Sequence, residues 1–340
     1  MRSLFIAAIL ALCLLAPSPS ASAKQKTLRI TFVDVEGGQA TLLVAPSGAS
    51  MLVDTGWPGF GDRDAKRIAD AAKSFGLKQI DYLVITHYHT DHVGGVPQLL
   101  KYVKVGSFID HGPNTENDEL APEGYAAYLA VLGKTKHIVA KPGDRIPVKG
   151  LDVEVVSSAG DTITSPVAGG GQPNPECASQ PEAPIDPSEN AASLGVLVKF
   201  GQFRFLDLGD LTKKKELQLV CPNNLLGTVD LFLISHHGFS WSNAKAMVLA
   251  LHPRVAVNIN SATKGGDAES WQIVHDSPGL QDIWALHFAD ASGDGHNSPK
   301  DFIANFGNEA DGHAIQATVQ PDGTFTVVNS RNNFQKIYKK

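Results

Sequence analysis

Residues Thr86–Gly95, THYHTDHVGG, place three histidines and one aspartate within six residues, directly after the apolar run YLVI. A tight loop that follows a buried strand can turn His87 and His89 toward one point, and Asp91 and His92 toward another point nearby. Imidazole nitrogens and carboxylate oxygens are the ligands that divalent metals such as zinc prefer. The spacing therefore indicates two adjacent metal positions. The alternative is a histidine-rich surface loop without a metal.

The composition is that of a globular protein with an acidic balance. The chain has 340 residues, 43% of them hydrophobic, which is enough to bury a sizeable core. Its formal net charge is -6, and it has no long run of lysine or arginine. Charge therefore does not favour nucleic acid as a partner, although it remains possible, and a small-molecule or ester substrate is expected.

The N-terminal segment is typical of a secretory signal. Arg2 precedes the apolar run Leu4–Leu15, and small residues at Ala21–Ala23 form a cleavage site. We expect residues 1–23 to be removed, which leaves a periplasmic or secreted chain that begins at Lys24. The alternative is a single-pass anchor, but the apolar run is short for a bilayer and no stable span is expected after cleavage.

Export would leave two cysteines, Cys177 and Cys221, in a compartment that permits disulfides. One bridge between them is predicted. Two unpaired thiols remain the alternative, because the sequence alone does not establish that the two residues come close enough to pair.

The order of apolar runs predicts an α+β fold. Three β-rich runs, LRITFVDV, ATLLVA and MLVDTG, form an antiparallel meander and are followed by a helix and a further strand. A second series of strands and helices begins after residue 190, and Asp322 and Gly323 indicate a closing hairpin. Short turns between strands favour two sheets packed face to face with helices outside, rather than a doubly wound parallel sheet. We expect one domain over 24–340 with a Pro/Gly-rich insertion at 160–190, either a functional loop or a linker.

Several motifs carry a family resemblance. THYHTDHVGG fits the T-H-x-H-x-D-H-x-G-G signature of the metallo-β-lactamase superfamily. DVEGGQATLLVAPSGASMLVDTG resembles the opening of the branch that includes the hydrolase domain of DNA-uptake competence proteins, and FLDLGD and ISHHG fall where that branch has its later motifs. The resemblance covers most of residues 30–238. It implies a four-layer αββα sandwich with the site on the edge where the two sheets meet.

The resemblance also implies the roles of individual residues. His87 and His89 would bind the first metal ion, and Asp91 and His92 the second. The remaining implied ligands are Asp210, which would bridge the two ions, and His236, which would complete the second position.

Two neighbours of these ligands have implied roles as well. His237 is the alternative to His236 at the second position, and whichever of the two is not a ligand would face the substrate. Asp54, in LVDTG, resembles the buried aspartate that orients the ligand loop.

The chain departs from the common family pattern at one ligand. Many members have a third histidine for the first metal, in a P-G-H-T-x-G-S context, whereas this chain has PSENAASLGVLV. Alignment on Ser193 puts Glu189 where that histidine would stand, with Asn190 next to it. The competence-like branch also lacks this histidine. A carboxylate or amide ligand, a weakly filled first position and a preference for manganese all remain open.

A site that holds two divalent ions, zinc or else manganese, is expected to catalyse hydrolysis by a metal-bound hydroxide. Coordination lowers the pKa of water from about 15.7 to roughly 7, so hydroxide forms near neutral pH. Asp91 and Asp210 would orient the hydroxide and move its proton, while His237 would protonate the leaving group or steady an oxyanion. We expect a secreted metal-dependent hydrolase that acts on a phosphodiester or phosphate ester. Alternatives are lactam, lactone or thioester hydrolysis at the same site, an iron oxidoreductase, and a non-catalytic metal-binding secreted protein.

Overall fold

The computed structural model describes residues 27–116, 122–133, 135–307 and 311–340. The predicted signal at residues 1–23 lies outside these ranges. Among the residues described, none of the helices has the length and apolar character that a bilayer crossing needs.

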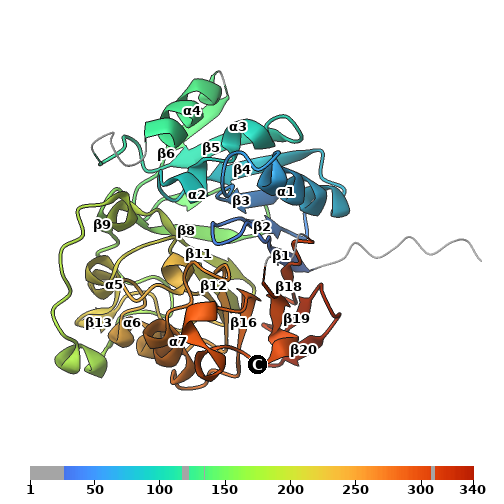
Figure 1. The fold of residues 1–340 in the computed structure, drawn as a ribbon. Helices are drawn as coiled ribbons and strands as arrows, with labels where there is room; N and C mark the ends of the chain where they lie inside the picture. The colour runs from blue at the N-terminus through green and yellow to red at the C-terminus, as the bar shows by residue number, and fades with distance from the viewer. Residues whose placement is uncertain (1–26, 117–121, 134, 308–310) are drawn as a thin grey trace, which may run out of the picture.

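The first sheet has nine strands in the order β20-β19-β18-β1-β2-β3-β4-β5-β6 (Figure 1). The predicted meander is confirmed, because β1, β2 and β3 pair antiparallel, and so is the hairpin at Asp322 and Gly323, which joins β18 to β19. From β3 to β6 the pairing is parallel. The strands are β1 Leu28–Phe32, β2 Thr41–Val44, β3 Ser50–Val53, β4 Gln79–Val84, β5 Lys104–Asp110, β6 Lys136–Val139, β18 Ile315–Val319, β19 Phe325–Asn329 and β20 Gln335–Tyr338.

The second sheet runs in the order β17-β16-β15-β14-β12-β11-β8-β7, with β9 paired to β8. Neighbouring strands pair antiparallel from β8 through β11 to β12, and they pair parallel from β12 to β17. The strands are β7 Arg145–Ile146, β8 Asp152–Ser158, β9 Asp161–Thr162, β11 Gly195–Phe200, β12 Phe203–Asp207, β14 Leu231–Leu233, β15 Val255–Asn258, β16 Asp282–His287 and β17 Ile303–Asn305.

Helices cover the outer face of each sheet. Buried residues of the two sheets form a shared core, in which the rings of Phe32 and Phe205 meet edge to face with centroids 5.9 Å apart. Two further cores join each sheet to its own helices. The predicted four-layer αββα sandwich is therefore confirmed. The helices are α1 Arg63–Ser74, α2 Thr90–Val93, α3 Val96–Leu99 and α4 Pro122–Leu132 on the first sheet, and α5 Lys213–Val220, α6 Lys245–Leu251 and α7 Ala268–His275 on the second.

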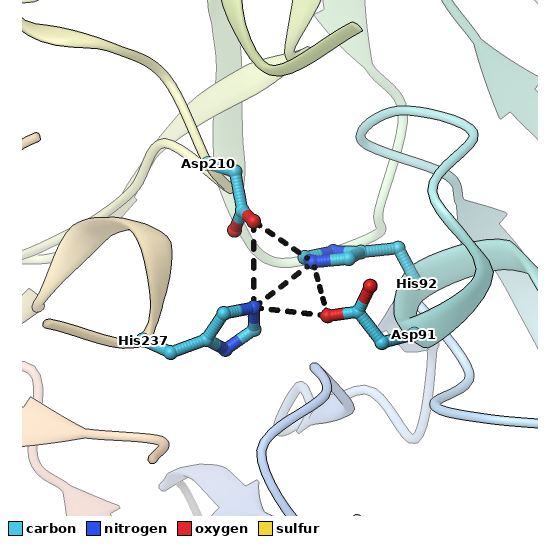
Figure 2. Close-up of side chains that lie close together, drawn as sticks. All are labelled: Asp91, His92, Asp210 and His237. Atoms are coloured by element: carbon cyan, nitrogen blue, oxygen red, sulfur yellow. Dashed lines mark hydrogen bonds and ion pairs between the residues drawn. The ribbon is translucent and has the colours of Figure 1, made fainter. Parts of the chain in front are cut away.

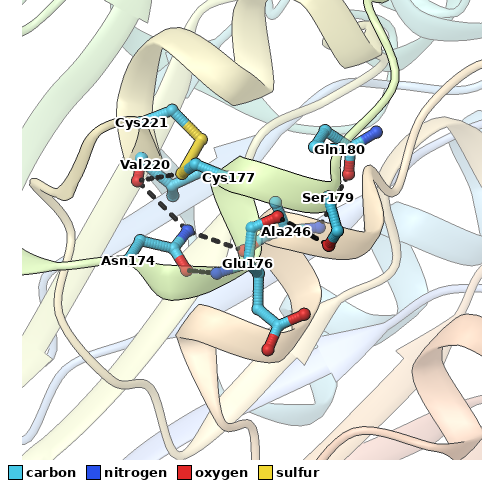
Figure 3. Close-up of a disulfide and its surroundings, with 8 residues drawn as sticks. All are labelled: Asn174, Glu176, Cys177, Ser179, Gln180, Val220, Cys221 and Ala246. Atoms are coloured by element: carbon cyan, nitrogen blue, oxygen red, sulfur yellow. Dashed lines mark hydrogen bonds between the residues drawn. A yellow bond between two sulfur atoms is a disulfide. The ribbon is translucent and has the colours of Figure 1, made fainter.

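The Pro/Gly-rich segment 160–190 is fastened to the helical layer of the second sheet. It contains β10 (Gln172–Pro173), which pairs with β13 (Asn223–Asn224), and the short helix η1 (Pro175–Ser179). Cys177 and Cys221 form the predicted disulfide, with Cα atoms 5.8 Å apart (Figure 3). Beside it, the Asn174 side-chain amide donates to the backbone carbonyl oxygens of Val220 and Ala246. The segment is thus tied to α5 and α6 at several points.

Candidate metal centre

Four buried side chains, Asp91, His92, Asp210 and His237, converge where the ends of the two sheets meet (Figure 2). His92 Nε2 lies 3.3 Å from Asp91 Oδ2, 3.2 Å from Asp210 Oδ2 and 3.2 Å from His237 Nε2. His237 Nε2 lies 3.1 Å from Asp91 Oδ2 and 3.4 Å from Asp210 Oδ2. One ligand atom from each residue falls within 4.8 Å of the others. We call these four residues the central cluster.

Asp54 and Thr86 fix the orientation of His92. The Asp54 carboxylate, at the end of β3, accepts from Thr86 N (2.8 Å), Thr86 Oγ1 (2.6 Å) and His92 Nδ1 (2.7 Å). Because a carboxylate only accepts, Nδ1 carries the proton and Nε2 presents its lone pair to the central cluster. The orienting position that the sequence suggested for Asp54 agrees with this geometry.

Asp210 follows β12 in a loop that lies against the histidine loop of the first sheet. Gly209 has a φ of +57°, and a Cβ at this position would lie 2.8 Å from the Cβ of Thr86. The Gly209 carbonyl accepts from the backbone N–H of His236 at 3.0 Å. Close backbone approach at Gly209 therefore brings the two sheets' loops together and places Asp210 between them.

The two adjacent histidines after β14 point in different directions. Both have left-handed backbone angles, with φ of 55° at His236 and 53° at His237 in the short helix η3 (Ser235–Gly238). Such angles are costly for non-glycine residues and cluster at functional sites. His237 enters the central cluster, whereas His236 approaches only Asp210 of that cluster (3.4 Å), has its Nδ1 3.2 Å from Ser242 Oγ, and turns its ring toward Trp241. The geometry thus favours the alternative ligand, His237, over His236, which the sequence had favoured.

His87 and His89 lie side by side next to the central cluster, but only His87 is fully buried. His87 Nε2 has no hydrogen-bond partner among the described residues, and it lies 3.9 Å from Asp210 Oδ2. Burial, reinforced by the charges of His92 and His89, holds the pKa of His87 well below its ordinary value, which leaves a neutral imidazole. His89 is partly exposed, and its Nε2 donates to Glu116 Oε1 at 3.3 Å.

Glu189 does not point at the metal centre. Its buried carboxylate accepts from the backbone N–H of Tyr88 (3.1 Å), from Thr115 N and Oγ1 (2.5 and 2.7 Å) and from His111 Nε2 (2.9 Å). Both of its oxygens are therefore occupied, and it anchors loops rather than offering a ligand atom. Asn190 has a buried side-chain oxygen with no partner among the described residues. Of the two positions that the alignment suggested, Asn190 keeps a free oxygen.

The central cluster attracts cations. Burial lowers the pKa of His92, but the carboxylates of Asp210, Asp91 and Asp54 outweigh it and hold that pKa well above its ordinary value. The same field that favours a proton on His92 favours a divalent cation in its place. Asp210 Oδ1 is also buried without a partner among the described residues. Buried orphan atoms of ligand type, gathered around acidic oxygens, fit a metal ion.

A second acidic group with a histidine lies apart from the central cluster. It comprises Asp34, Glu36 and His287. His287 Nε2 donates to Asp34 Oδ1 at 2.8 Å, and Arg67 Nη1 lies 3.0 Å from Asp34 Oδ2 and 3.4 Å from Glu36 Oε1. A guanidinium thus already neutralises this second group, which we call the Arg67 cluster.

A cavity of about 560 Å³ adjoins the metal centre. Its lining includes His89 and Asn190 from the centre, Ile185 from the 160–190 segment, and Lys213 and Trp241. Ile185 and Trp241 are 82% and 66% exposed. The cavity therefore offers a substrate an apolar wall, the cation of Lys213 and the carboxylates of Glu116 and Asp186.

Lys264 is a site residue that the sequence analysis missed. Its ammonium donates to Asp91 Oδ2 and to the backbone carbonyl of Gly37. The only signal in the sequence is a lone lysine before two glycines, TKGG, after the strand VAVNI. No spacing rule connects that lysine to Asp91.

Comparison with known proteins agrees with this architecture. The model of the "Metallo-beta-lactamase superfamily" matches residues 33–185. ComE operon protein 3 of Bacillus subtilis is 27% identical over 54% of this chain and 20% of its own length, and Recombination protein 2 of Haemophilus influenzae is 24% identical over 73% and 26%. The matched region thus spans about a fifth to a quarter of these two relatives. A hydroxyacylglutathione hydrolase of Methylobacillus flagellatus is 30% identical over 28% of this chain and 39% of that protein.

Among solved structures, CmlA, a diiron β-hydroxylase from Streptomyces venezuelae, matches with a TM-score of 0.41 and 18% identity over 78% of this chain and 48% of that one. The family match covers the histidine loop and the strands that carry it. In agreement with the resemblance of residues 86–95, the matched region, residues 33–185, belongs to the metallo-β-lactamase superfamily.

Proposed function

We propose that this chain is an exported, metal-dependent hydrolase that cleaves a phosphodiester or phosphate ester. The observation that carries the proposal is the central cluster, in which four buried nitrogen and oxygen ligand atoms lie within 4.8 Å of one another. The unpartnered His87 Nε2 and Asp210 Oδ1 beside it add two further ligand atoms. A purely structural ion-pair network would satisfy such atoms internally.

The residues divide naturally into two metal positions. One divalent ion would be held by His92, His237, Asp91 and Asp210. The other would be held by His87, His89 and Asp210, and Asn190 is a further candidate ligand for it. When bound, such ions make water a nucleophile near neutral pH and polarise the scissile group. Zinc suits this mixed set of nitrogen and oxygen ligands, and manganese is the alternative at the position of His87 and His89, which lacks the third histidine of many family members.

The remaining polar groups have tasks around the reacting atoms. Asp91 and Asp210 are placed to orient the attacking water and to accept its proton. With His237 as a ligand, His236 is the member of the pair that faces the substrate side, next to Trp241. Its ring nitrogen would donate a hydrogen bond to charge that develops on the leaving group.

The choice of phosphate ester rests on the resemblance to the competence-protein branch and on Lys213, a cation in the cavity wall. The match to a hydroxyacylglutathione hydrolase supports thioester hydrolysis as the second candidate. Export is supported by the signal-like residues 1–23 and by the Cys177–Cys221 disulfide, because such bonds persist mainly in oxidising compartments.

The test combines metal analysis with a substrate panel. The purified protein is analysed for its elements and assayed with a bis-aryl phosphodiester, a thioester, a chromogenic cephalosporin and a lactone. We expect up to two zinc or manganese ions per chain, phosphodiester cleavage, and loss of that activity with a chelator and its return with metal. Iron with no hydrolysis, or hydrolysis that survives chelation, would overturn the proposal.

A further inference from the structure

Lys264 occupies a position that a metal ion would also favour. Its ammonium contacts Asp91 Oδ2, the same carboxylate oxygen that lies 3.3 Å from His92 Nε2 and 3.1 Å from His237 Nε2. Its second partner is the backbone carbonyl of Gly37, at 2.6 Å. A protein cation is thus built into the second metal position.

The backbone holds Lys264 firmly in place. Ser261 N donates to the carbonyl of Lys264, and Lys264 N donates to Ser261 Oγ, both at 2.9 Å. Gly265 follows with a φ of +76°, and a Cβ there would lie 2.2 Å from the carbonyl oxygen of His237. The loop that presents Lys264 is therefore packed directly on the loop that presents His237.

The surroundings of the Lys264 side chain also favour its contact with Asp91. The Lys264 ammonium lies 5.1 Å from the centre of the Trp57 ring, and the side chain is only 27% exposed. An ammonium in such surroundings interacts with the carboxylate more strongly than it would in water. A divalent ion at Asp91 would meet this positive charge at close range and would have to displace it.

We propose that Lys264 competes with the second metal ion for Asp91, so that the position formed by Asp91, His92 and His237 binds metal more weakly than the neighbouring one. This inference rests on the metal centre of the proposed function. Among the described residues, Lys264 contacts Asp91 in the central cluster, where Asp210 Oδ1 keeps no partner, whereas Arg67 contacts Asp34 and Glu36 in the Arg67 cluster. Removing the charge of Lys264 therefore strengthens metal binding instead of merely destabilising the fold.

The experiment is a calorimetric titration of zinc into the chelator-treated full chain. Lys264→Met removes the charge, Lys264→Gln removes it but keeps a hydrogen-bond donor for Asp91, and Lys264→Arg keeps the charge. Lys101→Met, at an exposed lysine that pairs with Asp62 away from the metal centre and the cavity, is the matched control for net charge. In both neutral Lys264 variants the weaker zinc constant should tighten by about tenfold or more, since the repulsion is removed, while the tighter constant stays within about threefold.

Thermal unfolding provides a second readout that needs no activity. Without metal, Asp91 loses a partner in Lys264→Met and keeps only an uncharged one in Lys264→Gln, so zinc should raise the melting temperature of both variants more than it raises that of the wild type. The inference would be overturned if the weaker zinc constant were unchanged in Lys264→Met and Lys264→Gln, or if Lys101→Met tightened it equally.

The outcome is separable from the proposed function. If the wild type binds neither zinc nor manganese, both proposals fall. If the neutral variants bind the second ion more tightly but the wild type hydrolyses nothing on the panel, the proposed function falls and the inference about Lys264 stands.

Discussion

The central cluster and the Arg67 cluster contain similar residues but differ in how their charge is balanced. Each combines buried carboxylates with histidine. In the Arg67 cluster, one guanidinium contacts both Asp34 and Glu36, and His287 adds a hydrogen bond to Asp34. In the central cluster, Lys264 reaches only Asp91 and Asp210 Oδ1 keeps no partner among the described residues; the neighbouring His87 Nε2 keeps none either.

The difference shows what separates a metal centre from a structural ion-pair network. A buried carboxylate needs a compensating charge, and either a protein cation or a metal ion supplies it. Where arginine contacts the carboxylates, both acids have a cation within the protein, and of the three residues of the Arg67 cluster only His287 keeps an unpartnered atom, Nδ1, among the described residues. Where a carboxylate oxygen remains unpartnered, a metal ion completes the network.

The largest effect should come from breaking the central cluster. Asp210→Ala removes the carboxylate placed between the two metal positions, and we expect hydrolysis to fall by roughly a thousandfold, about 4 kcal/mol of transition-state stabilisation. Metal content, measured by elemental analysis, should fall with it. The matched control is Asp34→Asn in the Arg67 cluster, which should keep both metal and activity. An equal loss of metal and activity in the two variants would show that the central cluster and the Arg67 cluster do not differ in metal binding.

The next effect concerns stability in the Arg67 cluster. Arg67→Met removes the guanidinium and leaves buried Asp34 without its cation, which should lower the free energy of unfolding by about 3 kcal/mol. Urea denaturation measures this change. The control is Lys101→Met, which breaks the exposed pair with Asp62 and should cost less than about 1 kcal/mol. A similar, small cost in both variants would mean that the guanidinium is dispensable.

The contrast also explains which parts of the metal centre the sequence could predict. His87, His89, Asp91 and His92 lie in one loop after one strand, so their spacing alone predicts a ligand cluster. The αββα layers follow in the same way from strand order and short turns. A local sequence pattern is therefore sufficient to predict those site residues that lie close together in the sequence.

Other parts depend on contacts that no local pattern encodes. The choice between His236 and His237 depends on two consecutive left-handed residues, which turn adjacent side chains in different directions. Lys264 meets Asp91 only because the loop after β15 packs against the histidine loop across the two sheets. Glu189 aligned with a ligand position, but its four hydrogen-bond donors come from segments that lie more than 70 residues away.

A smaller effect is expected from a change in the cavity wall, which should weaken substrate binding without changing the metal centre. Trp241 is exposed, and its ring stacks on Phe239 with centroids 5.3 Å apart and an interplanar angle of 16°. Trp241→Ala removes apolar contact area from the cavity wall, so we expect KM to rise by about tenfold while kcat stays within about threefold. Steady-state kinetics on the active member of the panel measures both. A fall in kcat or in metal content instead would place Trp241 in the support of the central cluster.

The smallest effect is a pH dependence within the Arg67 cluster. Burial raises the pKa of Asp34, but the hydrogen bond and charge of His287 and the charge of Arg67 outweigh it and bring the pKa below its usual value of 3.8. A lowered carboxyl pKa stabilises the fold at pH values above 3.8, and this contribution is lost as the pH falls through the folded-state pKa.

Asp34→Asn cannot ionise, so its deficit in unfolding free energy relative to the wild type should be constant at higher pH and shrink as the pH falls below about 3.8. Urea denaturation at a series of pH values measures the deficit. A deficit that stays constant through this range would show that the Asp34 carboxylate gains nothing from His287 and Arg67, and the Arg67 cluster would then lose its standing as a completed ion-pair network.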